Sequence, residues 1–195
     1  FPMETADKKC RIAILASGEG SNAEALVAHF LNHPTIEVAL MVCNKEKAGV
    51  YARMAKYGVP CHTIGKAEWQ PGSTGEQVLD LMHREGIGLI VLAGFLAYIP
   101  EAIVKTYEGR IVNIHPSLLP SFKGAHAIQD AVDYGVKIFG VTTHFVDETL
   151  DGGRIIDQGA VVYEGSDIEE LTNLIHNIEH KLYVKTINKL INKKY

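Results

Sequence analysis

An asparagine and a histidine stand two residues apart, Asn113 and His115, where an apolar run of the sequence ends. Alternation along a strand points both side chains to the same side, and Pro116 and Pro120 restrict the backbone that follows. An amide and an imidazole at one point can donate hydrogen bonds to a developing oxyanion. A lone histidine more often only hydrogen-bonds neighbouring carbonyls, but the pairing with Asn113 favours a catalytic role for His115.

An acidic loop, residues 147–153, ends in two glycines and could bring a carboxylate to the same cleft. If Asp151 reaches His115, its negative charge would favour the protonated imidazole, which is a hydrogen-bond donor at both nitrogens. Most acidic turns are simply solvated, and that alternative stays open for this loop.

A glycine-rich segment, residues 17–22, lies between an expected strand and an expected helix and reads Ser-Gly-Glu-Gly-Ser-Asn. Free N–H groups at such a helix start can bind a phosphate. A simple tight turn and a dinucleotide-binding fingerprint are the alternatives. The fingerprint also needs an acidic residue at the end of the second strand, where this chain has Val42-Cys43-Asn44, so a monophosphate fits better.

The segment 94–99 reads Gly-Phe-Leu-Ala-Tyr-Ile and is apolar where a surface loop is usually polar. It could form the wall of a pocket for a flat ring. Ordinary packing beneath the next helix explains the pattern equally well.

The elements that would position these loops alternate between strands and helices. Apolar runs predict strands at 11–16, 37–42, 59–63, 89–93 and 110–114, and helical periodicity predicts helices at 22–31, 47–57, 74–85 and 100–107. This alternation predicts an α/β fold with a Rossmann-like wound, mostly parallel sheet and helices on both faces. The loops after the strands should therefore meet at the carboxyl edge of the sheet.

The pattern changes after residue 120. A helix at 125–134 and two strands at 140–146 and 155–162 are expected to extend the sheet. Ser166 and Glu169 have the spacing of a capping box, which predicts that a long C-terminal helix begins there. We expect residues 10–195 to form a single domain, preceded by a disordered or tag-derived segment at 1–9.

Composition limits the classes of partner. A net charge of −4 and 195 residues suit a single α/β domain that binds small molecules, and they give no reason to expect a nucleic-acid or membrane partner. The three cysteines have neither disulfide-framework nor zinc spacing, and no apolar leader or membrane span is visible, so we expect a cytoplasmic protein without a metal.

The segment 113–120, Asn-Ile-His-Pro-Ser-Leu-Leu-Pro, resembles the signature of folate-dependent formyltransferases. The glycine-rich loop, Val91 to Phe95, Gly124 to Ala127, and His144 to Gly153 are similar, in the same order, to segments of phosphoribosylglycinamide formyltransferases. The resemblance covers residues 11–185. It implies transfer of a formyl group from 10-formyltetrahydrofolate, as cosubstrate, to the amine of N1-(5-phospho-D-ribosyl)glycinamide in de novo purine (IMP) biosynthesis.

The resemblance also assigns roles to single residues and implies a cis peptide bond at Leu119-Pro120. It makes Asn113, His115 and Asp151 the catalytic residues of a direct transfer through a tetrahedral intermediate. It places the ribonucleotide against Gly20, Ser21, Asn22, Gly94, Pro116, His176 and Glu179. It places the folate against Leu92, Leu96, Ala97, Tyr98, Ile99, Asn113, Val146, Asp147, Glu148, Thr149, Leu150 and Asp151.

Three other functions were weighed against this one. A methionyl-tRNA formyltransferase would carry a further RNA-binding domain, for which the chain has neither length nor basic charge. A formyltetrahydrofolate hydrolase would share the three catalytic residues but has less reason to keep the phosphate loop together with Glu179. A non-catalytic phosphate- or nucleotide-binding module would leave Asn113, His115 and Asp151 unexplained. We expect a monomer or a homodimer.

Overall fold

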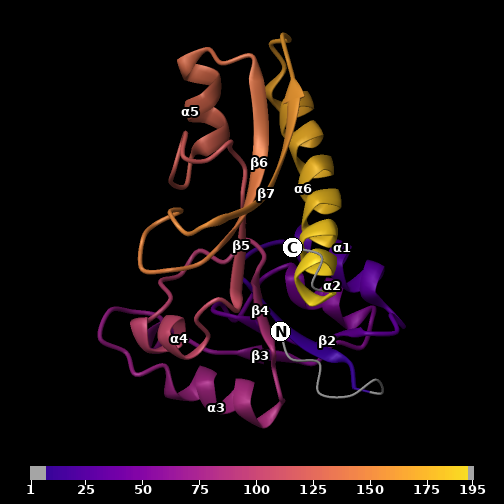
Figure 1. The fold of residues 1–195 in the computed structure, drawn as a ribbon, viewed down its shortest axis with the longest axis vertical. Coiled ribbons are helices and arrows are strands. Elements are labelled where there is room, and N and C mark those ends of the chain that lie inside the picture. Colours follow the sequence, from indigo (N-terminus) through magenta and orange to yellow (C-terminus); the bar gives the residue numbers. More distant parts are fainter. Residues whose placement is uncertain (1–7, 193–195) are drawn as a thin grey trace.

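The computed structural model describes residues 8–192 and forms one seven-stranded sheet (Figure 1). The segment 1–7 of the expected N-terminal tail lies outside the described residues, and Lys8 and Lys9 are exposed ahead of the first strand. The strands are β1 (Cys10–Ala16), β2 (Ile36–Cys43), β3 (Cys61–Thr63), β4 (Leu89–Leu92), β5 (Ile111–His115), β6 (Ile138–Phe145) and β7 (Ile155–Val162). Their order is β3-β2-β1-β4-β5-β6-β7, parallel up to β5 and antiparallel after it.

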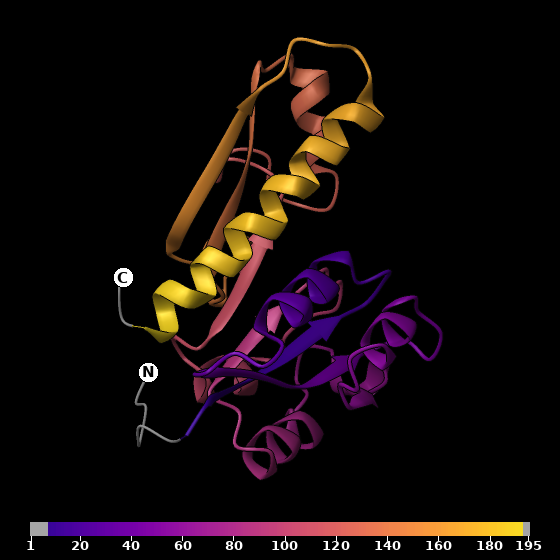
Figure 2. The ribbon, with the colours of Figure 1, turned by 90° about the vertical axis from the view of Figure 1, so that its right-hand side faces the viewer.

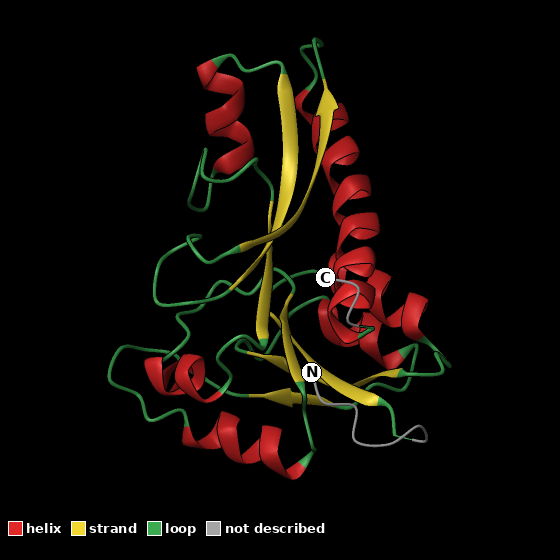
Figure 3. Ribbon diagram, in the orientation of Figure 1, coloured by secondary structure: helices red, strands yellow, loops and turns green. Residues whose placement is uncertain are grey.

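Helices cover both faces of this sheet (Figures 1 and 3). One core contains side chains of α1 (Ser21–Phe30), α2 (Val50–Ala55), α5 (Ala127–Tyr134) and the long α6 (Ile168–Ile191). The other contains side chains of α3 (Glu76–Arg84) and α4 (Glu101–Thr106), beside the 3-10 turn η1 (Lys66–Glu68). The expected α/β fold class is confirmed.

The central strand β1 shows why the sheet needs two layers of helices. Ile12 and Ile14 pack into the first core, and Ala13 and Leu15 pack into the second. All four are fully buried, which is typical of a parallel strand covered on both faces. The apolar run therefore specifies a strand at the centre of a three-layer structure.

The order of the strands creates a crevice between β1 and β4. Here the connections change direction, and ligands of wound sheets collect at such a point, outside the carboxyl ends of the strands. The loops that follow β1 and β4 are joined by a hydrogen bond from the Ser17 backbone N–H to the Gly94 carbonyl, 3.1 Å long. The glycine-rich loop and the apolar loop are therefore direct neighbours.

The long helix α6 links the two ends of the fold. Figure 2 shows it running diagonally from the β6–β7 end to α1, and it packs on β6, β7 and α1. The buried Tyr183 hydroxyl lies 2.6 Å from the Leu92 carbonyl and 3.1 Å from the Val112 carbonyl. This side chain fixes the middle of the helix to β4 and β5.

The start of α6 differs from the expectation. Its N-cap is Asp167, whose carboxylate accepts hydrogen bonds from the backbone N–H groups of Glu169 and Glu170, and the helix begins at Ile168. The predicted capping box from Ser166 to Glu169 is therefore wrong by one position. The ionised aspartate is the better acceptor for two helix N–H groups, and it displaces the serine from that role.

Candidate active site

His115, which the sequence predicts to be catalytic, lies at the end of β5 and is almost buried, with 5% of its surface exposed. His115 Nε2 lies 2.8 Å from the Phe122 carbonyl oxygen, and His115 Nδ1 lies 3.7 Å from Asp151 Oδ1. A carbonyl oxygen only accepts, so Nε2 carries a proton. A second proton on Nδ1 would face the carboxylate favourably, whereas a lone pair there would face it unfavourably. The ring nitrogens of His115 therefore face a carbonyl oxygen on one side and a carboxylate on the other.

The loop that returns from β5 to α5 supplies the carbonyl partner of this histidine. The peptide bond between Leu119 and Pro120 is cis, as expected. Phe122 has a positive φ of 54°, an uncommon backbone conformation outside glycine. The Ser117 hydroxyl donates to the Ser121 carbonyl at 2.6 Å and closes the turn. The turn thus holds the Phe122 carbonyl against His115.

Asp151, the second residue predicted to be catalytic, is fixed by its own loop. Asp151 has a φ of 49°, in the left-handed region, and its Oδ2 accepts the Gly124 N–H at 2.9 Å. Two residues later, a Cβ at Gly153 would overlap the Phe145 carbonyl. A glycine is thus required where the loop returns against β6, and this close approach brings Asp151 to the end of β5.

The amide of Asn113 is oriented by a residue that the sequence reasoning did not assign to the site. Asn113 pairs with His144 on the neighbouring strand β6, and Asn113 Nδ2 lies 3.4 Å from His144 Nε2. His144 Nδ1 donates to the Phe145 carbonyl at 2.9 Å, so Nε2 is the acceptor. Burial lowers the pKa of His144 and keeps it neutral. One N–H of the Asn113 amide stays free for a ligand.

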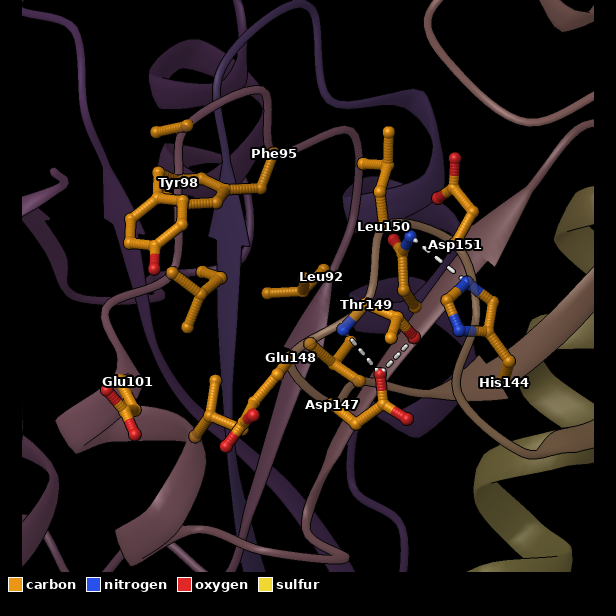
Figure 4. Close-up of a pocket in the computed structure, with 15 residues that line it drawn as sticks. Leu92, Phe95, Tyr98, Glu101, His144, Asp147, Glu148, Thr149, Leu150 and Asp151 are labelled. Atoms are coloured by element: carbon orange, nitrogen blue, oxygen red, sulfur yellow. Dashed lines mark hydrogen bonds between the residues drawn. The ribbon is translucent and has the colours of Figure 1, made fainter. Parts of the chain in front are cut away.

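Next to these residues lies a cavity of about 420 Å³. Figure 4 shows Phe95 and Tyr98 on one side of it and His144 and Asp151 on the other. Eleven of the twelve residues expected to contact the folate line it: Leu92, Ala97, Tyr98, Ile99, Asn113, Val146, Asp147, Glu148, Thr149, Leu150 and Asp151. Four lining residues were not expected: Phe95, Glu101, Val104 and His144.

Leu96 is the exception among the expected folate contacts. It is 76% exposed and does not line the cavity. Its neighbour Phe95 turns inward instead and packs edge-on against Trp69, with 4.7 Å between the ring centroids. The Leu96 backbone N–H donates to the buried Ser17 hydroxyl at 2.9 Å. This bond fixes the turn so that residue 95, rather than residue 96, faces the pocket.

Ser17 is a second residue that the sequence reasoning missed. Its hydroxyl accepts from Leu96 and donates to Asn44 Oδ1 at 2.6 Å, so it joins the ends of β1, β2 and β4. Only 1% of its surface is exposed. A serine directly after a buried strand is the signal that could have indicated this role.

Residues 147–151 of the acidic loop also line the cavity. Asp147 Oδ1 accepts from the Thr149 backbone N–H at 2.8 Å and from the Thr149 hydroxyl at 2.5 Å (Figure 4). These two bonds lower the pKa of the Asp147 carboxyl. The loop is thus a tight turn with an ionised carboxylate at its base.

The glycine-rich loop leads into α1 as expected. Gly20 is the N-cap of this helix, with a φ of 81°, and a Cβ there would collide with Val50. The first N–H groups of a helix have no partner inside it, so those that follow Gly20 can bind an anion. Ser21 and Asn22 form the first turn.

The middle of α6 completes this side of the site. Glu179 is buried, and its Oε2 accepts from Asn22 Nδ2 and His176 Nδ1, each at 3.0 Å. Asn22 Oδ1 is buried and has no hydrogen-bond partner among the described residues. A buried oxygen without a partner costs free energy unless a ligand donor satisfies it. The remaining expected ribonucleotide contacts flank the crevice: Gly94 next to Ser17, and the half-buried Pro116 after His115.

Within residues 8–192, no group of three or more histidine, cysteine, aspartate or glutamate side chains is placed to hold a metal ion. Over the same residues, none of the helices combines the length and apolar character needed to cross a membrane.

Comparison with known proteins identifies the family. Residues 10–187 match the family model described as formyl transferase. The chain is 36% identical to the phosphoribosylglycinamide formyltransferase of Bacillus subtilis over 93% of its own length and 94% of that protein. The chain belongs to the phosphoribosylglycinamide formyltransferase family.

Other members support this assignment. The crystal structure of glycinamide ribonucleotide transformylase 1 from Geobacillus kaustophilus superposes with a TM-score of 0.88 at 38% identity, covering 94% of this chain and 99% of that one. The trifunctional purine biosynthetic protein adenosine-3 of Gallus gallus is 38% identical over 90% of this chain, which spans 18% of that larger protein. The expectation of a formyltransferase enzyme with a Rossmann-like fold is confirmed.

Proposed function

We propose that this formyltransferase moves the formyl group of 10-formyltetrahydrofolate directly to the amine of N1-(5-phospho-D-ribosyl)glycinamide, a step of de novo purine synthesis, at Asn113, His115 and Asp151. The observation that carries the proposal is that residues from β5 and from the loop after β6 meet beside a cavity with apolar walls. The folate ring system occupies this cavity, and the ribonucleotide phosphate binds at the start of α1.

The two ligand sites flank the catalytic residues. The loop after β4 contributes apolar side chains such as Phe95 and Tyr98 to the folate cavity, and residues 146–151 line it with polar and apolar side chains. The loop at residues 20–22 offers backbone N–H groups, and Glu179 offers a carboxylate for the hydroxyls of a ribose. Because the loops after β1 and β4 are hydrogen-bonded to each other, both ligands meet at the end of β5.

The reaction then needs a fixed pair of donors. The acceptor amine attacks the formyl carbon, and the carbonyl oxygen becomes an oxyanion. The free N–H of Asn113 and the imidazolium of His115 stabilise this charge. The tetrahedral intermediate collapses by breaking the bond from the formyl carbon to N10 of the folate.

One proton has to move during this step. The amine loses a proton on attack, and N10 gains one as the leaving group. Asp151 accepts the first proton, directly or through a bound water, and the same group returns a proton to N10. Asp151 also stabilises the charge on His115 from 3.7 Å away. The chain forms no covalent intermediate with the substrate.

We infer that residues 10–195 act as one domain, because a single sheet and its two cores span the described residues. The three cysteines are free thiols, which supports a reducing compartment such as the cytoplasm. A monomer and a homodimer both leave the site composed of residues from one chain.

An absorbance assay tests the proposed reaction. Purified protein is mixed with 10-formyl-5,8-dideazafolate, with and without the ribonucleotide, and compared with His115→Ala. We expect deformylation only with the acceptor, and about a hundredfold to a thousandfold loss of turnover in the variant. His83→Ala, in the last turn of α3, is the control and should keep the wild-type rate. Equal deformylation without acceptor would instead identify a hydrolase, and deformylation in neither case would refute the proposed activity.

A further inference from the structure

A buried carboxylate lies next to the proposed phosphate site. Glu179 is 5% exposed, and its Oε2 accepts hydrogen bonds from Asn22 Nδ2 and His176 Nδ1. Both nitrogens bond to the same carboxylate oxygen, each at 3.0 Å, so the two side chains lie close to each other. Asn22 belongs to the first turn of α1, so His176 lies close to the N–H groups that would hold the phosphate.

This arrangement creates an electrostatic conflict. An ionised Glu179 repels a phosphate dianion at the start of α1, and the partial positive charge of the helix N-terminus offsets only part of that repulsion. A carboxylate only accepts, so His176 Nδ1 carries a proton. A second proton, on Nε2, would give the imidazole a full positive charge that neutralises Glu179.

We propose that His176 sets the affinity for the phosphate-bearing acceptor, which binds more tightly when the imidazole carries its second proton. The inference rests on the proposed function, because it takes the acceptor phosphate to lie at residues 20–22. It goes beyond a contact with the ribonucleotide, because it makes acceptor binding depend on the charge of one side chain.

The groups around His176 support this assignment. The hydrogen bond and the charge of Glu179 raise the pKa of His176, and partial burial opposes the rise. Burial lowers the pKa of His180, the other histidine beside Glu179, so His180 loses its second proton at a lower pH than His176 does. Arg53 of α2 is paired with Glu24 at 2.6 Å, which directs its charge away from Glu179. Of the two histidines, His176 is therefore the one that keeps its charge to the higher pH.

An NMR titration tests the inference without any activity measurement. The ring signals of His176, assigned by their loss in His176→Gln, are followed against pH with and without ribose 5-phosphate. Binding and protonation are reciprocal, so the ligand should raise the pKa of His176, each unit corresponding to about a tenfold gain in affinity. A titration of His176 that ribose 5-phosphate leaves unchanged would overturn the inference.

A kinetic experiment tests the consequence for catalysis. The acceptor KM is measured from pH 6 to pH 9 for wild type, His176→Gln and His29→Gln, a control in the last turn of α1. The glutamine can still donate to Glu179 but cannot become charged. Titration of the substrate itself is common to all three proteins, so the ratios of KM isolate His176.

The expected result is a KM ratio that changes with pH. As pH rises through the raised pKa of His176, wild type should lose an affinity advantage of several-fold to about tenfold over His176→Gln, while the ratio of their kcat values stays constant. His29→Gln should follow wild type. If His176→Gln also follows wild type at every pH, the inference fails. Absence of acceptor-dependent transfer in wild type would refute the proposed function instead, and the NMR titration would still decide the role of His176.

Discussion

The two proposed ligand sites of the cleft differ in the polarity of the groups that line them. The folate side is a cavity bounded by apolar residues such as Leu92 and Tyr98, and its loops are fixed by hydrogen bonds inside the protein. The proposed acceptor side consists of helix N–H groups, a buried carboxylate and Asn22 Oδ1, which has no hydrogen-bond partner among residues 8–192. One half is complete without its ligand, and the other has polar groups that a ligand would complete.

This difference gives the two sites different roles in binding. Apolar walls gain affinity from the area they remove from water, with little demand on direction. Unpartnered polar groups discriminate strongly, because any ligand that fails to pair them leaves them buried at a cost. We therefore expect the folate side to tolerate changes in its ligand and the acceptor side to reject them.

The largest effect is expected from a substitution of Asp151, which lies where the two proposed ligand sites meet. Asp151→Asn removes the charge next to His115 but suits the same backbone, because asparagine tolerates a positive φ. Turnover should fall about a hundredfold or more, since the proton acceptor and the partner of the imidazolium are both lost. Steady-state kinetics should show an almost unchanged acceptor KM. An unchanged kcat would refute the role of Asp151.

A glycine pair tests whether the acceptor side can be damaged alone. Gly20→Ala places a Cβ against Val50 at a φ of 81°, whereas Gly18→Ala in the same loop meets open space. Strain of this kind costs about 1–3 kcal/mol, so the acceptor KM of Gly20→Ala should rise roughly tenfold. The folate KM should stay constant. Similar kinetics for the two variants would show that the loop does not hold the acceptor.

The buried Ser17 hydroxyl holds the loop on the folate side in place. Ser17→Ala removes the hydroxyl that joins Asn44 to the Leu96 N–H, and leaves both without that partner. Urea unfolding should show a loss of about 1–3 kcal/mol, and the folate KM should rise more than the acceptor KM. Ser166→Ala, at an exposed position before α6, is the control and should match wild type. Equal stability of the two variants would contradict the role of Ser17.

The smallest effect is a pH dependence of stability. The folded-state pKa of His144 is lowered by burial, so its neutral form stabilises the fold above the unfolded pKa, near 6.5. That contribution is lost as pH falls from 6.5 toward the lower folded value. Urea unfolding at pH 7.5 and pH 5.5 should show a smaller acid loss for His144→Gln than for wild type. His29→Gln should lose as much as wild type, and an identical loss in all three proteins would exclude His144 as a cause.

Much of the fold followed from periodicity. The strands and the long helix were expected close to where they lie, because apolar runs and helical spacing are local signals. The ends of elements were less accurate. The expected helix 47–57 is only Val50–Ala55, and the strand expected at 59–63 is only Cys61–Thr63. Ends depend on caps and on neighbouring strands, which a local pattern does not specify.

The site was predictable where chemistry and spacing coincide. Asn113 and His115 alternate on β5, so their common side followed from the sequence. The contact between His115 and Asp151 depends on the turn of the acidic loop, and the assignment of Asp151 came from family resemblance. His144 and Ser17 were missed because their roles arise from pairing between strands far apart in the sequence. Such contacts require the sheet order.

The bond between Asn22 and Glu179 joins residues 157 positions apart. During synthesis on the ribosome, the proposed phosphate loop emerges directly after β1, and the carboxylate beside it emerges only with α6, after all seven strands of the sheet. A nascent chain that has folded its first strands therefore has no finished acceptor site. The proposed acceptor site is therefore complete only once α6 has packed against α1.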